Sequence, residues 1–338
     1  MAKSSSWRTR FLLIAVLAAL AGLLAYLHLA DFADRPLSIS PAPAALSVAP
    51  GDGLNKVLPK LRAAGVQSGM DWQWQLLARR MGMAGRIQVG DYEIADGSTP
   101  ADILRKLSRG DTVRIRYTLV EGRAFRQVRA ELAGIDGLQD DLAGKSDAEI
   151  MALLGRHAVH PEGRFLPDTY FVPKSGKASD LLRQAADAMD AALAEAWQQR
   201  DPAAPLKSPD ELLILASIVE KETGAAHERP QIAGVFARRL RLGMRLQTDP
   251  SVIYGIGERY DGDIRTRDLR TDTPYNTYTR AGLPPTPIAM PGRAALRAAA
   301  HPAPGDTLYF VATGNGEHVF SATYAEHKKA VATYQLKR

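Results

Sequence analysis

The chain contains no cysteine among its 338 residues. Disulfides, thiolate catalysis, cysteine-based zinc sites and a lipoprotein anchor are therefore excluded. A sequence without cysteine is compatible with an oxidising compartment, but it does not identify one.

A marked excess of one charge is also lacking in the body of the chain. The formal net charge is +6, but Lys3, Arg8 and Arg10 lie in a short N-terminal tail, and from residue 11 onward 40 basic residues face 37 acidic ones. No cluster of basic and aromatic residues interrupts this balance, so we expect no nucleic-acid partner. The sequence also has no HExxH and no GxxxxGK[ST] motif, and "GIGERY" has two of the three glycines of a dinucleotide motif. We expect neither a metal nor a cofactor.

Near the N-terminus, the run from Phe11 to Leu29 has 19 residues without a charge. At 1.5 Å per residue this helix would be about 28 Å long and would nearly span a hydrocarbon core. Basic residues precede the run, and Asp31 and Asp34 follow it, so the positive-inside rule predicts a cytoplasmic tail and a body across the membrane. The alternative is a cleaved signal peptide, which would have a shorter apolar core and a small-x-small cleavage site. We favour an uncleaved anchor.

The remaining sequence predicts an α+β protein built in segments. Proline-rich residues 30–45 read as a linker, and strands such as "RIQVGDYEI" alternate with amphipathic helices in a small α/β unit over residues 46–120. One of these helices begins with Ser98 or Thr99 as N-cap and Pro100 at the first position. A connecting region follows over 121–175, and residues 176–338 form a mixed α/β domain with helices at 178–200 and from 209, and a terminal hairpin around 314–316.

The stretch "SPDELLILASIVEKETG" specifies a helix over about 209–223. Ser208 and Glu211 form a capping box, Pro209 suits the first helical position, and Gly224 suits the residue after the end. Apolar residues cover most of the circumference of this helix, so we expect it to be buried.

Two glutamates, Glu220 and Glu222, lie in the last turn of this helix. Burial and the negative end of the helix dipole both raise the pKa of a carboxyl there, which suits a general acid. Glu220 falls beside the small residues Ala216 and Ser217, which leave room for a ligand. Glu222 falls among branched side chains and is expected to pair with an arginine. Periodicity alone leaves open that both glutamates are structural ion-pair partners.

Five stretches resemble one family, the endolytic murein transglycosylases or YceG-like proteins. They are "EGRFLPDTY", "LASIVEKET", "RLRLGMRLQTDPSVIYG", "TPYNTYTRAGLPPTPIAMPG" and "AAAHPAPGDTLYFV". Together with the N-terminal anchor, they cover essentially the whole chain in the order of the family. The resemblance implies a single-pass protein of the inner membrane, with a LysM-like subdomain over 46–120 and a catalytic domain over 176–338 in the periplasm.

The resemblance also implies an activity. Such enzymes cleave the β-1,4 bond between N-acetylmuramic acid and N-acetylglucosamine in nascent glycan strands, leave a 1,6-anhydro end, and so terminate elongation. The catalytic glutamate of the family falls on Glu220. A hydrolase normally needs two carboxylates, whereas here one can protonate the glycosidic oxygen and then accept the proton of the attacking C6 hydroxyl. The expected partners are peptidoglycan strands, the inner membrane and wall-synthesis enzymes.

Polar and aromatic residues around these motifs suit a glycan groove. We expect ligand contacts from two loops, which supply Gln247, Thr248, Asp249 and Tyr254, and Tyr275, Asn276, Thr277 and Tyr278. The alternative is that Asp249 and Pro250 begin a helix, and that Tyr275 and Tyr278 pack in the core.

Two rival interpretations remain. The protein could be a non-catalytic scaffold that holds glycan near the synthesis machinery, with Glu220 in a structural role. It could also be an inverting hydrolase, for which Asp249 is the candidate second carboxylate.

Overall fold

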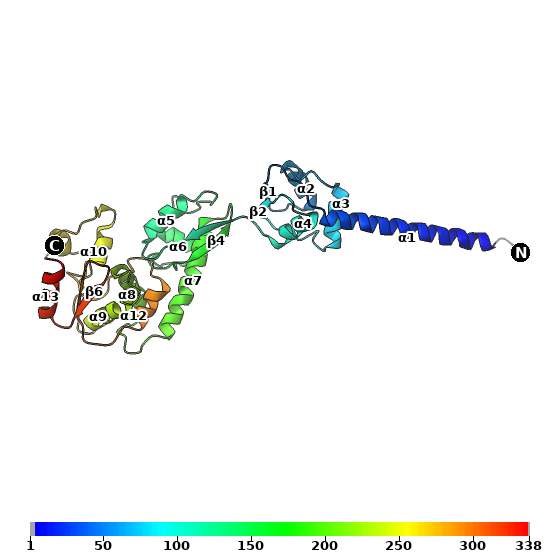
Figure 1. Ribbon diagram of the computed structural model, residues 1–338. Coiled ribbons are helices and arrows are strands. Elements are labelled where there is room, and N and C mark those ends of the chain that lie inside the picture. Colours follow the sequence, from blue (N-terminus) through cyan, green and yellow to red (C-terminus); the bar gives the residue numbers. More distant parts are fainter. Residues whose placement is uncertain (1–3, 337–338) are drawn as a thin grey trace. The chain divides into compact units, whose positions relative to one another are not determined.

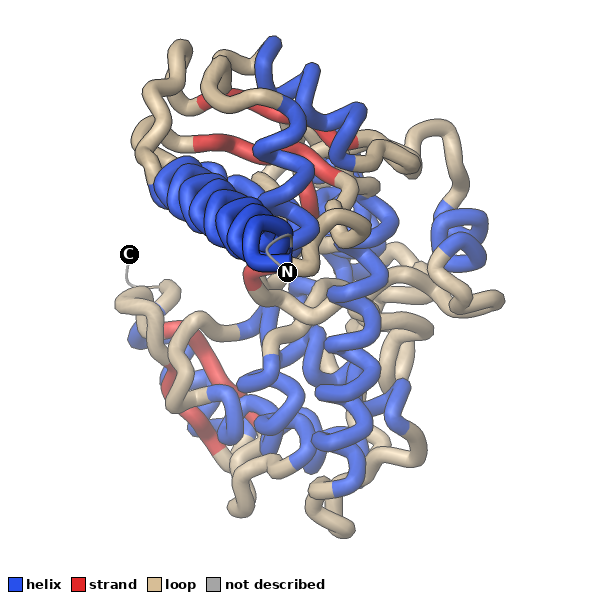
Figure 2. The backbone as a smooth tube through the Cα atoms, turned by 90° about the vertical axis from the view of Figure 1, so that its right-hand side faces the viewer, coloured by secondary structure: helices blue, strands red, loops and turns tan. Residues whose placement is uncertain are grey.

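The computed structural model of the chain describes residues 4–336, so Lys3 of the predicted cytoplasmic tail lies outside the described residues. As expected, helices and strands are mixed, with helices predominating and short strands (Figure 2). The chain divides into two compact units. One extends to Ile115 and includes Pro173–Ser175, and the other holds Arg116–Val172 and the chain from Gly176.

The first unit contains a long helix followed by shorter elements (Figure 1). Its elements are α1 (Ser4–Asp34), β1 (Ala44–Val48), α2 (Leu54–Ala63), α3 (Asp71–Arg80), β2 (Gly90–Ile94) and α4 (Pro100–Arg109). Among the described residues, α1 is the one helix long and apolar enough to cross a membrane. It extends beyond the predicted run 11–29 at both ends.

The segment predicted as a linker differs from that expectation. Helix α1 continues to Asp34, and Phe32 packs edge-on against Trp74 of α3 with ring centroids 5.5 Å apart. Leu37 and Ile39 are buried, and the backbone of Leu37 exchanges hydrogen bonds with the 97–98 turn. The apolar residues of this segment therefore join the core of the first unit, which proline content alone did not indicate.

The short strands of the first unit pair as expected for an amphipathic α/β fold. β1 and β2 are antiparallel, with Leu46 opposite Tyr92, and alternate residues of β1 are buried. Helix α4 begins with Thr99 as N-cap, whose hydroxyl accepts the N–H of Asp102, and with Pro100 at its first position, as predicted.

The second unit is mainly helical (Figure 1). Strands β3 (Arg114–Thr118) and β4 (Thr169–Pro173) pair, and the division between units runs through both. The other elements are α5 (Phe125–Ala133), α6 (Asp147–Leu153), α7 (Ala178–Gln198), α8 (Pro209–Glu222), α9 (Arg229–Arg241), α10 (Asp249–Ile256), the short η1 (Gly257–Arg259), α11 (Thr266–Arg270), α12 (Arg293–Ala300), β5 (Tyr309–Ala312), β6 (His318–Ser321) and α13 (Tyr324–Tyr334). β5 and β6 form the predicted antiparallel hairpin.

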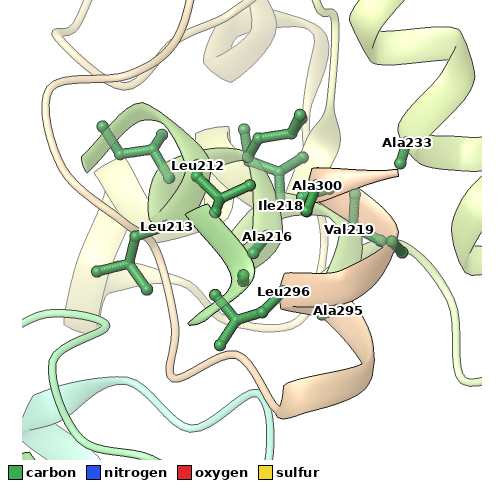
Figure 3. Close-up of a cluster of buried hydrophobic side chains, with 14 of the residues drawn as sticks. Leu212, Leu213, Ala216, Ile218, Val219, Ala233, Ala295, Leu296 and Ala300 are labelled. Carbon is green, nitrogen blue, oxygen red and sulfur yellow. The ribbon is translucent and has the colours of Figure 1, made fainter. Parts of the chain in front are cut away.

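Helix α8 forms the centre of the core of the second unit. Its N-cap Ser208 accepts the N–H of Glu211 at 3.2 Å, and Pro209 occupies the first position, as predicted. The other half of the predicted capping box does not form, because the Glu211 carboxylate accepts the N–H of Lys207, and the helix ends at Glu222 with Thr223 as C-cap. Figure 3 shows its buried side chains against α9 and α12, with labels on Leu212, Leu213, Ala216, Ile218, Val219, Ala233, Ala295, Leu296 and Ala300. Full burial of a Leu, Ile or Val side chain contributes about 1.5–3 kcal/mol, so the helix and its last turn are firmly held.

Candidate active site

The carboxylate of Glu220 is held by neighbouring backbone and side chains. Its Oε2 accepts the N–H of Gly292 at 2.9 Å, and its Oε1 accepts from the Arg229 guanidinium at 3.3 Å. The side chain retains 5% of its exposure. Burial raises the pKa of Glu220 and the nearby Glu121 carboxylate adds to this rise, whereas Gly292 and Arg229 oppose it. Glu220 thus joins the C-terminus of α8 to the first residues of α9 and α12.

The space beside Glu220 that small neighbours were expected to leave for a ligand is occupied by the protein. The backbone N–H of Ile288 donates to the Ser217 hydroxyl at 3.0 Å, and Ser217 is fully buried. At Gly292, an added Cβ atom would meet the carboxylate end of the exposed Glu121 side chain, which can rotate aside. Sequence spacing showed which neighbours on α8 are small, but not that a segment 70 residues later packs against them.

Glu222, two residues further, has different surroundings. It lines a pocket of about 440 Å³ together with Arg239, Asp249 and Tyr278. The Thr248 hydroxyl donates to its Oε1, and none of the hydrogen bonds found among the described residues reaches its Oε2. The expected arginine pair is therefore found at Glu220, and the carboxylate of Glu222 faces a pocket.

The protonation of Glu222 suits proton donation near neutral pH. Burial raises the pKa of Glu222 to about 7, and the negative charge of Asp249 adds to the rise. The Thr248 hydrogen bond and the Arg239 charge oppose it. Lys221, between the two glutamates, donates to the Gly122 carbonyl at 3.3 Å.

Three of the predicted ligand residues line the pocket of Glu222. Tyr278 donates its hydroxyl to Asp249 Oδ1 at 2.6 Å, so this tyrosine reaches the pocket rather than packing wholly in the core. Asp249 is also the first residue of α10 and is followed by Pro250, in agreement with the alternative prediction that these two residues begin a helix. Gln247 has a φ of 52°, a left-handed conformation rare for a residue other than glycine, and strain of this kind often marks functional sites.

Two buried threonines, also among the predicted ligand residues, form hydrogen bonds next to the pocket. Thr248 and Thr277 are almost fully buried. The N–H of Thr248 donates to the Thr277 hydroxyl at 3.0 Å, and Ser251 hydrogen-bonds the same hydroxyl at 2.9 Å. This buried network fixes the hydroxyl of Thr248 that donates to Glu222.

The other three predicted ligand residues are not brought to this pocket. Asn276 is 1% exposed, and its side-chain amide donates to three backbone carbonyls, two within α11 and one directly after it. The Tyr254 hydroxyl donates to Glu162 Oε2 at 3.0 Å. The Tyr275 ring packs edge-on against Tyr254, and its hydroxyl hydrogen-bonds Thr286 at 2.9 Å.

Glu162 is a second buried carboxyl with a strongly raised pKa. It is 3% exposed, and burial raises its pKa to about 7 although the Phe125 N–H and the Tyr254 hydroxyl donate to it. Both of its carboxylate oxygens accept hydrogen bonds from the protein, so we interpret Glu162 as a structural residue that links α5 to α10. It lies in the "EGRFLPDTY" stretch, where sequence alone did not single it out.

The pocket also contains residues that the sequence reasoning missed. Tyr309 of β5 stacks on His327 of α13 with ring centroids 5.1 Å apart and planes at 21°. The guanidinium of Arg239 lies 5.1 Å from the Tyr309 centroid and donates to the carbonyls of Leu246 and Leu308. Tyr324 and His327, three residues apart on one helical turn, could have been grouped by their spacing.

The pocket therefore combines a carboxyl that holds its proton near neutral pH, further polar groups, and aromatic rings. Hydroxyl-rich ligands are bound by such polar groups and by packing on aromatic faces. Among the described residues there is no group of three or more His, Asp or Glu side chains with the geometry of a metal site.

Three comparisons relate the chain to known proteins. A profile of the YceG-like family matches residues 46–333. A Bacillus subtilis (strain 168) protein named endolytic murein transglycosylase is 33% identical over 279 residues, which is 77% of this chain and 76% of that protein. A Streptococcus pneumoniae protein of the same name is 27% identical over 285 residues, and the match spans about half (51%) of that protein. The crystal structure of a YceG-like protein from Listeria monocytogenes covers 85% of this chain with a TM-score of 0.55 and 28% identity.

Proposed function

Because the chain belongs to the YceG-like family, we propose that it is a lytic transglycosylase that cleaves the glycan strands of peptidoglycan. Two observations support the activity. The relatives from Bacillus and Streptococcus carry the name of that enzyme, and the second unit has a polar, aromatic pocket around a carboxyl with a pKa near 7.

We further propose Glu222 as the acid of this reaction, in place of the Glu220 expected from the resemblance. The observation that carries the proposal is that Glu222 Oε2 accepts no hydrogen bond from the described residues and that Glu222 lines a pocket with Gln247, Asp249 and Tyr278. Both carboxylate oxygens of Glu220 accept hydrogen bonds from the protein. Glu220 remains the second candidate, because burial also raises its pKa.

In the proposed reaction, the protonated Glu222 gives its proton to the glycosidic oxygen, and the bond from C1 of N-acetylmuramic acid to that oxygen breaks. The released sugar end keeps this proton as its new hydroxyl group. The C6 hydroxyl then bonds to C1, and its proton returns to the carboxylate. The product is a 1,6-anhydro end, no water is consumed, and one carboxyl serves as acid and then as base. Cuts within nascent strands would terminate their elongation.

The proposal includes a location. Helix α1 would cross the inner membrane once, with the basic tail in the cytoplasm and both units in the periplasm, close to the synthases that make the strands. The antiparallel β1 and β2, separated in sequence by α2 and α3, support a LysM-like subdomain that would hold glycan.

The identity of the product tests the activity. The detergent-solubilised full chain is incubated with uncross-linked glycan strands, and the fragments are analysed by mass spectrometry. Anhydro-ended internal fragments are expected. Reducing-end fragments would instead indicate a hydrolase that uses Asp249, and binding without any cleavage would indicate a scaffold.

A further inference from the structure

The exposed face of helix α3 carries an unusual set of side chains. Trp72 and Leu76 are 51% and 44% exposed, and Arg79 and Arg80 follow on the same side of the helix. The spacing i, i+4, i+7 and i+8 places them in one stripe, which we call the α3 stripe. The opposite face, with Trp74, packs in the core of the first unit.

Helix α3 is fixed beside the place where α1 leaves the unit. The α1 side chains from Phe11 to His28 are exposed, and burial begins at Leu29. His28 hydrogen-bonds Gln73 of α3 at 3.0 Å, and Figure 1 shows α3 at the end of the unit from which α1 extends. The contacts thus place α3 next to the last turn of the exposed apolar stretch.

A second contact sets the depth of the α3 stripe. Arg80 donates to the Tyr26 hydroxyl at 3.2 Å, and its guanidinium lies 4.6 Å from the Tyr26 ring centroid. A hydrocarbon core of about 30 Å corresponds to about 20 helical residues, so a bilayer that begins near Arg10 ends near Leu29. Tyr26 would then lie at the lipid interface, where tyrosine is enriched, and Arg80 would lie among the headgroups.

We infer that the α3 stripe rests on the lipid headgroups of the membrane that α1 crosses, with Trp72 and Leu76 at the interface and the two arginines on anionic lipids. This inference rests on the proposed membrane anchoring of α1. Tryptophan, leucine and arginine on one helix face are typical of helices that lie in the membrane interface. Among the described residues, no carboxylate forms an ion pair with Arg79 or Arg80, so neither charge is neutralised by the protein, although Arg80 also contacts Tyr26.

This contact would fix the orientation of the first unit relative to the membrane. A single helix leaves a unit free to tilt, whereas a second contact through α3 holds it against the surface. The β1–β2 sheet, which lies away from α1 in Figure 1, would then face away from the membrane.

The experiment uses the full chain in nanodiscs of phosphatidylcholine and phosphatidylglycerol. Because the chain has no cysteine, single nitroxide labels can be placed by Leu76→Cys on the stripe, Ala45→Cys on the exposed side of β1 and Leu20→Cys within α1. Oxygen, which concentrates in lipid, and a water-soluble nickel chelate then report the depth of each label. We expect the label at 76 to show a higher ratio of oxygen to nickel accessibility than the label at 45, and the label at 20 to show the highest ratio.

A charge variant completes the test. Arg79→Glu should reduce the docked fraction by at least about fivefold in the anionic discs, since one basic residue near such a surface contributes about that factor. Lys56→Glu, a matched exposed change on α2, should leave the label at 76 unchanged. If the label at 20 lies in lipid while labels at 76 and 45 are equally accessible to nickel, the inference is overturned and the anchor stands. If the label at 20 lies in water, both are overturned.

Discussion

Glu220 and Glu222 lie two residues apart in the last turn of α8 and face different parts of the protein. On the side of Glu220, the Gly292 N–H and the Arg229 side chain occupy both carboxylate oxygens. On the side of Glu222, Thr248 occupies one oxygen, and a pocket of about 440 Å³ opens next to the side chain.

The comparison shows what a raised pKa can and cannot identify. Burial raises the pKa of both glutamates, and of Glu162 as well. Structural and catalytic acids share this property, because it follows from desolvation. Our proposal therefore separates the three by whether a carboxylate oxygen that lacks a hydrogen bond from the described residues lines a pocket.

The largest expected effect is on the rate after Glu222→Gln. The amide keeps the shape of the side chain and can still accept from Thr248, but it has no proton to give. General acid catalysis contributes about 10²–10⁴-fold, so we expect a loss of that size in the rate of anhydro-product formation, with a normal melting temperature. Full activity in this variant would remove Glu222 from the mechanism.

The matched change Glu220→Gln should act on stability first. It leaves the mostly buried Arg229 without its carboxylate partner, and we expect a loss of about 1–3 kcal/mol in the free energy of unfolding. Activity of the folded variant should stay within about tenfold of the original enzyme, well above that of Glu222→Gln. A folded, fully stable and inactive Glu220→Gln protein would reverse the roles of the two residues.

Gly292→Ala tests how tightly the loop beside Glu220 is packed. The added Cβ would meet the carboxylate of the exposed Glu121 side chain, which can rotate aside, so we expect a loss of at most about 1 kcal/mol in the free energy of unfolding. Because the φ of Gly292 is −79°, backbone strain is not the reason. Thermal unfolding should show the loss, and adding Glu121→Ala should restore much of it, with Glu121→Ala alone as control. No recovery in the double variant would contradict the predicted contact.

The smallest effect should come from the aromatic side of the pocket. Tyr309→Ala removes an aromatic face that lines the pocket, and a lost contact of about 0.5–1.5 kcal/mol between this face and a sugar ring would correspond to about 2–13-fold in KM for glycan. Tyr309→Phe keeps the ring and should bind nearly as well. Steady-state kinetics on defined strands distinguish the two, and an equal loss in both would indicate that the hydroxyl matters instead.

Local signals in the sequence predicted the main elements correctly. The Ser208–Glu211 cap, the Pro209 start, the Thr99–Pro100 start and the terminal hairpin all depend on residues close together in the chain. The apolar circumference of α8 likewise predicted its burial.

Which of the two glutamates donates the proton stays a prediction, because it depends on contacts distant in sequence that helical spacing does not show. Helical spacing showed small residues beside Glu220, but the 286–292 loop that fills this space lies about 70 positions away. The pocket at Glu222 needs the β5–β6 hairpin and α13, which no local pattern places next to α8. Similarly, Asn276 looked like a ligand residue because its three backbone acceptors could not be seen in the sequence.

The pH dependence of kcat/KM tests most directly whether Glu222 donates the proton. The protonated form is the active one, so activity should be present below the folded-state pKa of about 7 and should fall about tenfold per pH unit above it. Because the pKa of Glu162 is also raised to about 7, the profile is measured in Glu162→Gln as well, where the alkaline decline should remain. A rate that is constant through this range, or a decline that disappears in Glu162→Gln, would contradict the account.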